Sequence, residues 1–289
     1  MAKGKIRFGI IGCGTIADFH AQAIRSCPNA ELVGISDVVE VKAREFASKH
    51  GVERIYTRVE EVAASPSIDA VCICTPSGLH LDAALPCLTE GKHILVEKPL
   101  EISTERIDQI IQLSNSVGRK VGVIFQLRFS PDCQIVKKAL NSHKLGKIHI
   151  ADAYIKYYRS QDYYDSAGWR GTWEVDGGGA LMNQGIHYID LLLSFAGDVS
   201  SVIGQCSTQA RMIDVEDTAL ALVRYADGAV GIIEGTTLAY PGLSSRIEIH
   251  GECGTICLED DRISRWDIQG EEVQIKRSEE RRVGKECRS

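Results

Sequence analysis

The feature that most constrains this chain is a glycine-rich turn close to its start. The turn, Gly12-Cys13-Gly14-Thr15-Ile16-Ala17, stands between the apolar run Ile6 to Ile11 and a segment with helical periodicity. In such a turn the first glycine permits a tight bend, the second lets a diphosphate approach the backbone, and a small third residue lets the helix pack on the strand. The exposed N–H groups at the helix start then bind the anion. We therefore predict a dinucleotide site that includes Gly12, Gly14, Thr15 and Ile16.

An acidic residue follows the second apolar run. Asp37 comes directly after the run Leu32 to Ser36, roughly 20 residues beyond the glycines, where a carboxylate accepts hydrogen bonds from a ribose diol. The same negative charge would repel a 2′-phosphate. The sequence therefore favours NAD over NADP as the cofactor and assigns Asp37 to its site.

The pattern of the chain changes near residue 126. The first 125 residues alternate apolar runs with helix-period segments, which is typical of a parallel α/β sheet, whereas the rest combines helices with alternating runs and an Asp-Gly hairpin signal. We predict an α/β Rossmann domain over 1–125 and an α+β domain with an open, largely antiparallel sheet over 126–276. The expected strands include 6–11, 32–36, 70–74, 93–96, 121–125, 148–158, 218–225, 230–234, 246–250 and 255–259, and the expected helices include 15–27, 131–146 and 180–195.

The last thirteen residues differ from everything before them. The segment 277–289 has no apolar period, and it matches the in-frame translation of a common short-read sequencing adapter. We therefore expect a non-native tail over 277–289 and a second domain that is truncated near Lys276.

Composition argues against several classes of protein. The formal net charge is −6, and no run rich in Lys or Arg occurs before the C-terminal end, which argues against a nucleic-acid partner. No stretch approaches the ~18 apolar residues of a membrane span, and the apolar start lacks a signal-peptide cleavage site, so we expect a cytoplasmic protein. The ten cysteines include no Cys-x-x-Cys pair. We interpret them as small buried hydrophobes and predict no metal site.

Polar segments follow three later strands, at the sheet edge where ligands bind in this architecture. Thr75-Pro76-Ser77-Gly78-Leu79-His80 follows the run 70–74, Glu97-Lys98-Pro99 follows the run 93–96, and Gln126-Leu127-Arg128 closes the last strand. His20, in the first helix, is expected to pack against its neighbours. The residues of these segments that we assign to the cofactor are Thr75, Pro76, His80, Glu97, Lys98 and Gln126.

Three ordered motifs carry a resemblance to a known family. The glycine turn, Glu97-Lys98-Pro99 and the segment Gly177-Gly178-Gly179-Ala180-Leu181-Met182-Asn183-Gln184-Gly185-Ile186-His187-Tyr188-Ile189-Asp190 together resemble the Gfo/Idh/MocA oxidoreductases, which include glucose–fructose oxidoreductase and inositol dehydrogenase. The resemblance implies a Rossmann domain, an open-sheet substrate domain, NAD(H) or NADP(H), and a sugar, cyclitol or nucleotide-sugar substrate. It also implies homodimers or homotetramers that pair through the open sheet. By this resemblance Lys98 and His187 are catalytic, and Asn183 contacts the substrate at a position that often holds aspartate.

The expected reaction moves a hydride between nicotinamide and a hydroxyl or keto carbon. It requires a base for the proton and a partner for the developing alkoxide. On a helix Asn183, His187 and Asp190 share one face, so Asp190 can orient the imidazole. We predict His187 as the general base or acid and Lys98, held in extended backbone before Pro99, as the electrostatic partner. The alternatives are a packing histidine and a solvated lysine.

An aromatic segment, Tyr163 to Trp173, precedes the triple glycine and contains Arg170. We expect it either to stack on a sugar and bind an anionic group, or to pack against the sheet or a second subunit. Two other functions stay open: a NAD-dependent glycoside hydrolase and a sensor that binds the cofactor without turnover. The residues assigned to the substrate are Asn183, Arg128, Tyr157, Trp169 and Arg170.

Overall fold

The computed structural model describes residues 4–271, and the predicted tail over 277–289 lies outside them. Contacts divide the chain into two compact units. The first comprises Met1–Phe125, Arg159–Ile186 and Cys206–Thr218, and the second comprises Gln126–Tyr158, His187–Gln205 and Ala219–Ser289. The expected boundary at residue 126 assigns two of these segments, 159–186 and 206–218, to the other domain, so the units and the predicted domains differ there.

The first unit contains a six-stranded sheet in the order β3-β2-β1-β4-β5-β6. Every neighbouring pair in it is parallel, and the strand order reverses between β1 and β4, which is where ligands bind in a doubly wound sheet. The predicted Rossmann architecture is therefore confirmed. The strands are β1 (Ile6–Ile11), β2 (Ala30–Ser36), β3 (Arg54–Tyr56), β4 (Ala70–Ile73), β5 (His93–Val96) and β6 (Val121–Val123).

Helices cover both faces of this sheet, because alternate strand residues point to opposite sides. Ile10 and Cys72 pack with α1 and α2 in one core cluster, whereas Ile11 and Val71 pack with α3, α4 and α5 in another. Both β3 and α3 are too short to show a periodic pattern in the sequence. The helices are α1 (Thr15–Ser26), α2 (Glu40–His50), α3 (Val59–Ala64), α4 (His80–Thr89) and α5 (Thr104–Val117), with the 3-10 turn η1 (Ser77–Leu79) before α4.

Two later helical segments belong to the first unit. They are α7 (Gln161–Asp165) and the π-helix η3 (Ala180–Gly185). The prediction of one regular α-helix over 180–195 is wrong at its start, because residues 180–185 form π turns and α8 (Ile186–Ala196) begins only after them. Extra residues per turn shift the phase of the side chains, and such π segments are frequent at functional sites.

The second unit contains a seven-stranded sheet in the order β13-β12-β11-β7-β10-β9-β8. The pair of β7 and β10 is parallel, while β11 and β12 pair with their neighbours in antiparallel fashion. The structure thus confirms a mixed, mostly antiparallel sheet. Its strands are β7 (Ile148–Lys156), β8 (Val199–Ser207), β9 (Thr218–Tyr225), β10 (Val230–Thr236), β11 (Arg246–Gly251), β12 (Gly254–Glu259) and β13 (Arg262–Ile268).

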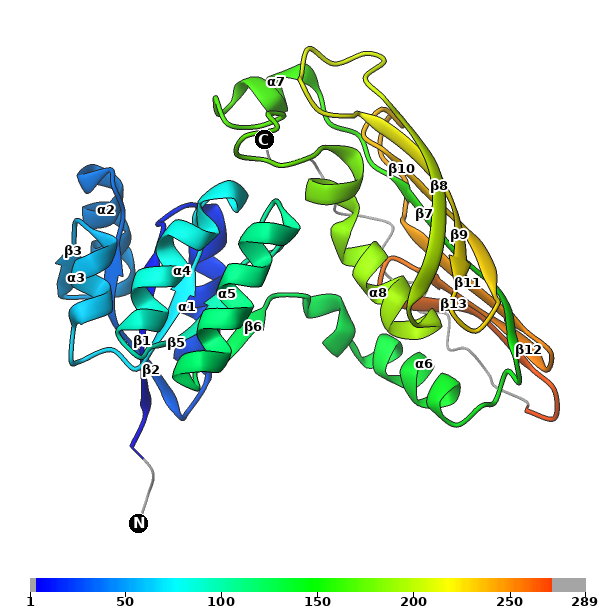
Figure 1. The fold of residues 1–289 in the computed structure, drawn as a ribbon, viewed down its shortest axis with the longest axis horizontal. Helices are drawn as coiled ribbons and strands as arrows, with labels where there is room; N and C mark the ends of the chain where they lie inside the picture. Colours follow the sequence, from blue (N-terminus) through cyan, green and yellow to red (C-terminus); the bar gives the residue numbers. More distant parts are fainter. Residues whose placement is uncertain (1–3, 272–289) are drawn as a thin grey trace. The chain divides into compact units, whose positions relative to one another are not determined.

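Helices α6 (Pro131–Asn141) and α8 lie beside one face of this second sheet (Figure 1). Pro131 stands at the first helical position of α6, where its missing N–H has no intrahelical partner to lose, and a short 3-10 turn, η2 (Gln126–Phe129), precedes it. Helix α6 ends five residues earlier than the predicted Gly146, at Asn141. Among residues 4–271, no helix has the length and apolar character needed to cross a bilayer.

Candidate active site

The glycine turn has the geometry that a diphosphate site requires. Gly12 has φ +91°, and a Cβ at this residue would lie 2.7 Å from the carbonyl oxygen of Cys74, so only glycine fits the bend between β1 and α1. Gly14 is the N-cap of α1, where no side chain accepts a hydrogen bond from the first turn. A Cβ at Gly14 would meet no atom within 4 Å. The space beside Gly14 at the start of α1 is therefore open, as an incoming phosphate would need.

Asp37 is fixed beside this turn. One oxygen of its carboxylate accepts a hydrogen bond from the N–H of Cys13 and the other from the N–H of Val39, both at 2.8 Å. Each oxygen keeps a second lone pair, which a ribose diol can use. Thr15 and Ile16 are exposed at the start of α1. The four elements predicted for the dinucleotide site, namely the bend, the open N-cap, the helix start and the acid, thus occur together in the first unit.

His80 lies under the loops that follow β4 and β5. Its side chain is only 1% exposed, with Nδ1 2.9 Å from the carbonyl oxygen of Pro99 and Nε2 2.9 Å from that of Thr75. Burial lowers the pKa of His80, against the opposing effect of these carbonyls. Both ring nitrogens thus face backbone carbonyls and the ring joins two loops, while the predicted contact of His80 with the cofactor stays a prediction.

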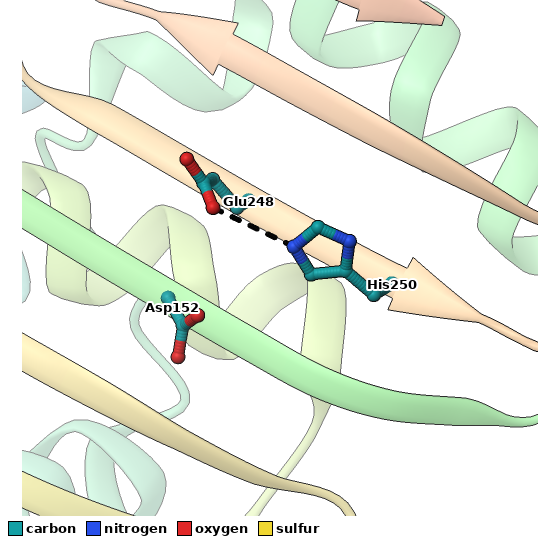
Figure 2. A group of neighbouring side chains, drawn as sticks. All are labelled: Asp152, Glu248 and His250. Atoms are coloured by element: carbon teal, nitrogen blue, oxygen red, sulfur yellow. Dashed lines mark ion pairs between the residues drawn. The ribbon is translucent and has the colours of Figure 1, made fainter. Parts of the chain in front are cut away.

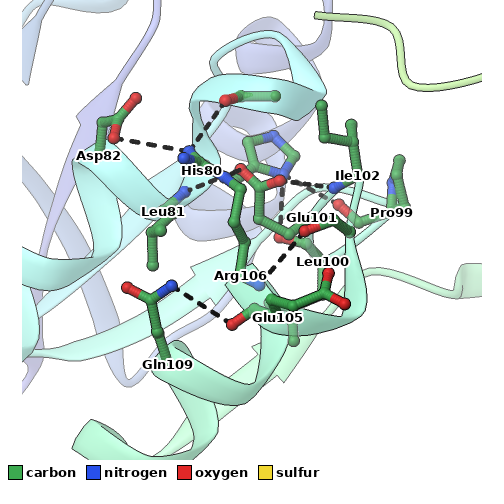
Figure 3. A network of polar contacts seen from close by, with 12 residues as sticks. His80, Leu81, Asp82, Pro99, Leu100, Glu101, Ile102, Glu105, Arg106 and Gln109 are labelled. Carbon is green, nitrogen blue, oxygen red and sulfur yellow. Dashed lines mark hydrogen bonds and ion pairs between the residues drawn. The ribbon is translucent and has the colours of Figure 1, made fainter. Parts of the chain in front are cut away.

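A buried carboxylate completes this network. Figure 3 shows Glu101 between α4 and α5, where it is fully buried and lies 3.0 Å from the Nε of Arg106. Its oxygens also accept hydrogen bonds from the N–H groups of Leu81 and Ile102. The network anchors the loop that carries Glu97, Lys98 and Pro99.

A hydrogen-bond partner in α1 also fixes the side chain of Glu97. Its carboxylate lies 2.8 Å from Nε2 of His20, and both side chains are buried. Burial raises the pKa of Glu97, but the hydrogen bond with His20 and the nearby charge of Lys98 give a net lowering, so the carboxyl stays ionised. His20 therefore packs, as expected, and it also orients Glu97.

Lys98 lies at the centre of a polar cluster in the first unit. Its ammonium donates a hydrogen bond to the carbonyl oxygen of Asn183 over 2.7 Å, and the Lys98–Pro99 peptide bond is cis. Burial lowers the pKa of Lys98, the carboxylates of Glu97 and Asp176 partly oppose this, and Arg159 and Arg170 lower it further. Lys98 is thus a partly desolvated cation and not the solvated loop lysine of the alternative interpretation.

Asp176 and Asn183 meet beside Lys98. The Nδ2 of Asn183 donates to one oxygen of Asp176, and the N–H of Gly171 donates to the other over 2.8 Å. Burial raises the pKa of Asp176, and the nearby cations Arg170 and Lys98 oppose that rise. Asp176 was not predicted, although it stands directly before the triple glycine of the family motif.

Two arginines border the same cluster. The guanidinium of Arg170 lies 4.3 Å from the ring centroid of Tyr163 and 4.9 Å from that of Trp169. Arg159 lies 5.1 Å from the Tyr163 ring and donates to the side chain of Gln184 over 3.0 Å. Among residues 4–271 the buried Nε of Arg170 has no hydrogen-bond partner. The rings of Tyr163 and Trp169 therefore lie against arginine side chains. Arg159 belongs to the cluster around Lys98, although the sequence analysis did not predict it.

Pro76 stands directly before η1 in the first unit, whereas four predicted site residues belong to the second unit, namely Gln126, Arg128, Tyr157 and His187. Both oxygens of Asp190 accept hydrogen bonds from Arg128, at 2.5 and 2.6 Å, so the carboxylate expected to orient His187 has a guanidinium partner. The ring of Tyr157 lies 6.5 Å from that of Tyr188. His187 is in the first turn of α8, Gln126 begins η2, and the predicted pairing of His187 with Lys98 stays a prediction.

A further group of ionisable side chains lies on the seven-stranded sheet (Figure 2). Ligand atoms of Asp152, Glu248 and His250 all lie within 4.8 Å of one another. Arg246 pairs with Glu248 over 2.6 Å and His250 lies 3.5 Å from it, while the N–H of Ile232 donates to Asp152. These charges and hydrogen bonds account for the group within the sheet, and we assign no ligand to it.

Two family models match the chain. One, described as the oxidoreductase family with an NAD-binding Rossmann fold, matches residues 6–125, and the other, described as the GFO/IDH/MocA C-terminal domain, matches residues 133–257. Myo-inositol 2-dehydrogenase from Thermotoga maritima is 29% identical over 273 residues, which cover 89% of this chain and 76% of the relative.

Two solved structures are similar over nearly the whole chain. The WlbA dehydrogenase from Bordetella pertussis is 37% identical with a TM-score of 0.89, and covers 93% of this chain and 83% of its own. The WlbA dehydrogenase from Chromobacterium violaceum is 34% identical with a TM-score of 0.90, and covers 94% of this chain and 80% of its own. Both were solved in complex with NADH and UDP-GlcNAcA.

Proposed function

Because the chain belongs to the Gfo/Idh/MocA oxidoreductase family, we propose that its substrate is a nucleotide sugar that bears a carboxylate. The chain is an NAD(P)-dependent dehydrogenase or reductase of the sugar and polyol class, like the relatives described above. None of those relatives is a glycoside hydrolase or a sensor by name, so the two alternative functions gain no support from them.

The observation that carries the proposal is the cationic cluster of the first unit. Arg159 and Arg170 both act electrostatically on Lys98. The carboxylates of Glu97 and Asp176 act on it as well, so three cations face two carboxylates. A guanidinium binds a carboxylate through two parallel hydrogen bonds, and Arg170 places a guanidinium near enough to Lys98 to lower its pKa. Both WlbA structures hold an anionic nucleotide sugar, which is consistent with this chemistry.

The bound nicotinamide would supply or accept the hydride. The residues of this chain would stabilise the charge on the reacting oxygen and transfer the proton of the hydroxyl group. We propose that the Lys98 ammonium hydrogen-bonds the reacting oxygen and stabilises its developing negative charge. Its partial burial strengthens that interaction. His187 would take or return the proton as general base or acid. Asn183 accepts the hydrogen bond of Lys98 through its backbone carbonyl. Its side-chain amide does not ionise, so it would contact the substrate without relaying a proton.

The cofactor proposal rests on Asp37. Its carboxylate is held beside the glycine turn by two backbone N–H groups, where it can accept hydrogen bonds from a ribose diol and would repel a 2′-phosphate. NAD is therefore proposed over NADP.

Single-turnover measurements of NADH fluorescence test the substrate class. The chain is mixed with NAD⁺ and either UDP-GlcNAcA or UDP-GlcNAc, which lacks the carboxylate. A site built for a charged group rejects the analogue without it, so we expect a rate at least about 100-fold lower for UDP-GlcNAc. The R170Q variant should lose most of this preference, whereas R44Q, which removes an exposed arginine of α2, should keep it. Equal rates with both sugars would overturn the proposal.

The open face of the seven-stranded sheet is proposed to pair with a second copy of the chain. Alternate residues of three neighbouring strands leave large apolar side chains exposed there, and such contiguous patches mark interaction surfaces. Light scattering of the wild type should show a dimer or tetramer. The variant L222E should form smaller species, whereas the control V41E, at an exposed position of α2, should keep the wild-type assembly. A monomeric wild type would contradict this. The exposed residues are Ile150, Leu220, Leu222, Val230 and Ile232.

A further inference from the structure

We propose that Glu216 is a positioning residue, which holds the π-helix η3 so that Asn183 stays against Lys98. The inference rests on the proposed role of Lys98 in the reaction. It concerns a residue that no sequence motif singled out, and every contact in it lies within the first unit.

Glu216 binds three successive backbone N–H groups at the start of η3. Its two carboxylate oxygens accept from Gly179 over 2.9 Å and from Leu181 over 3.0 Å, and its backbone carbonyl accepts from Ala180 over 3.0 Å. The N–H groups of a first helical turn have no intrahelical partners. One buried residue therefore satisfies the start of the helix from a distant part of the chain.

The contact between Glu216 and the triple glycine admits no side chain. A Cβ at Gly179 would lie 1.8 Å from the carbonyl oxygen of Glu216, far inside any van der Waals contact. Gly179 is therefore required where Glu216 approaches, and the two positions form one structural unit. The third glycine of the motif Gly177-Gly178-Gly179 is therefore needed because Glu216 leaves no room for a side chain there, and not because the chain must be flexible.

The contact between Glu216 and Gly179 affects the orientation of Asn183, four residues after Gly179. The carbonyl oxygen of Gly179 accepts from the N–H of Asn183 over 3.1 Å and also from that of Gln184, five residues on, over 3.3 Å. The second bond belongs to the π-helix Ala180–Gly185. A change of one residue in the phase of a helix rotates each following side chain by about 100°. The Asn183 carbonyl that accepts from Lys98, and the Asn183 amide that donates to Asp176, both depend on that phase.

The variant E216Q tests this role, because glutamine keeps the shape but replaces one acceptor oxygen with a donor. The matched control is D217N. Asp217 is also fully buried, and its carboxylate accepts from the N–H groups of Gln209, Ala210 and Arg211 in a neighbouring turn. Both variants lose a buried acceptor, but only E216Q should alter the surroundings of Lys98.

The readout is the reactivity of the Lys98 amine, measured without substrate. Acetylation of Lys98 is followed by mass spectrometry as a function of pH, and NAD⁺ affinity is followed by fluorescence titration. In E216Q the midpoint of the pH dependence of Lys98 acetylation should move to higher pH, toward that of an ordinary lysine, because the amine becomes more hydrated. NAD⁺ affinity should stay within about twofold, since the glycine turn is untouched, and D217N should leave the midpoint unchanged.

Equal midpoints in wild type, E216Q and D217N would overturn the inference. If E216Q does not fold, the same measurement on E216D decides, and an unchanged Lys98 midpoint there overturns it equally. Failure of the proposed function looks different: K98R would then turn over UDP-GlcNAcA as fast as wild type, whatever the labelling shows.

Discussion

Replacing Gly12 and Gly14 separately by alanine distinguishes a glycine needed for folding from one needed for a ligand. At Gly12 the backbone has φ +91°, and the added Cβ would lie 2.7 Å from the carbonyl oxygen of Cys74. A left-handed conformation costs an L-residue ~1–2 kcal/mol, and overpacking costs a further ~1–3 kcal/mol. G12A should therefore lower the free energy of unfolding by about 2–5 kcal/mol, a large part of the roughly 5–15 kcal/mol of a typical protein.

At Gly14 the same substitution meets neither obstacle. Its backbone, at φ −79° and ψ −175°, is open to any residue, and no atom lies within 4 Å of the new Cβ. G14A should change the free energy of unfolding by no more than about 1 kcal/mol, because the gain of ~0.4–1 kcal/mol through the unfolded chain is opposed by the poorer N-cap preference of alanine. The methyl group would, however, occupy the space through which a diphosphate approaches. NAD⁺ affinity should fall roughly 10- to 100-fold, or about 1.4–2.8 kcal/mol.

Urea unfolding followed by circular dichroism measures the first effect, and fluorescence titration with NAD⁺ measures the second. The two variants serve as controls for each other, because each is expected to change one quantity and spare the other. Wild-type affinity in G14A would refute the placement of the diphosphate at this helix start. A fully stable G12A would refute the steric argument at Cys74.

Three further outcomes are expected. D37S should raise the relative kcat/KM for NADP⁺ by at least about tenfold by removing the repulsion of a 2′-phosphate, and an unchanged cofactor ratio in steady-state assays would contradict this. Because burial lowers the pKa of Lys98, kcat should fall as pH rises through that lowered pKa and the ammonium loses its proton. A pH–rate profile that stays flat up to the pKa range of ordinary lysines would argue against the proposed role of Lys98 in the reaction. Burial raises the pKa of Cys13 to about 12, so iodoacetamide should label Cys13 more slowly than exposed Cys27 in peptide mapping, and equal rates would refute it.

The dinucleotide site could be predicted from the sequence because its determinants are local. The strand, the two glycines and the start of α1 are consecutive, and each constraint acts between near neighbours. Asp37 follows the adjacent parallel strand, so its place beside the turn comes from the sheet register Ile11↔Ser36. In such a segment the pattern of residue types and the geometry carry the same information.

Burial, in contrast, could not be read from a motif. Thr75 to His80 looks like a ligand loop by position, yet the imidazole at its end turns inward to two carbonyl oxygens. The deciding partner is Pro99, 19 residues further along the chain. A histidine after a strand is compatible with both orientations, and only the packing of α4 against the loop after β5 selects one.

The π-helix at 180–185 shows where reading from local pattern ends. Its residues have the apolar spacing of an ordinary α-helix, and that spacing predicted one face for Asn183, His187 and Asp190. The phase is decided elsewhere, by Glu216, which lies 35 residues or more from the N–H groups it accepts. Periodicity reports which face of a helix is apolar, but it does not report the partner that satisfies the helix start. The side chains nearest Lys98 are therefore the ones that the sequence defines least, because three distant segments must meet before their positions are set.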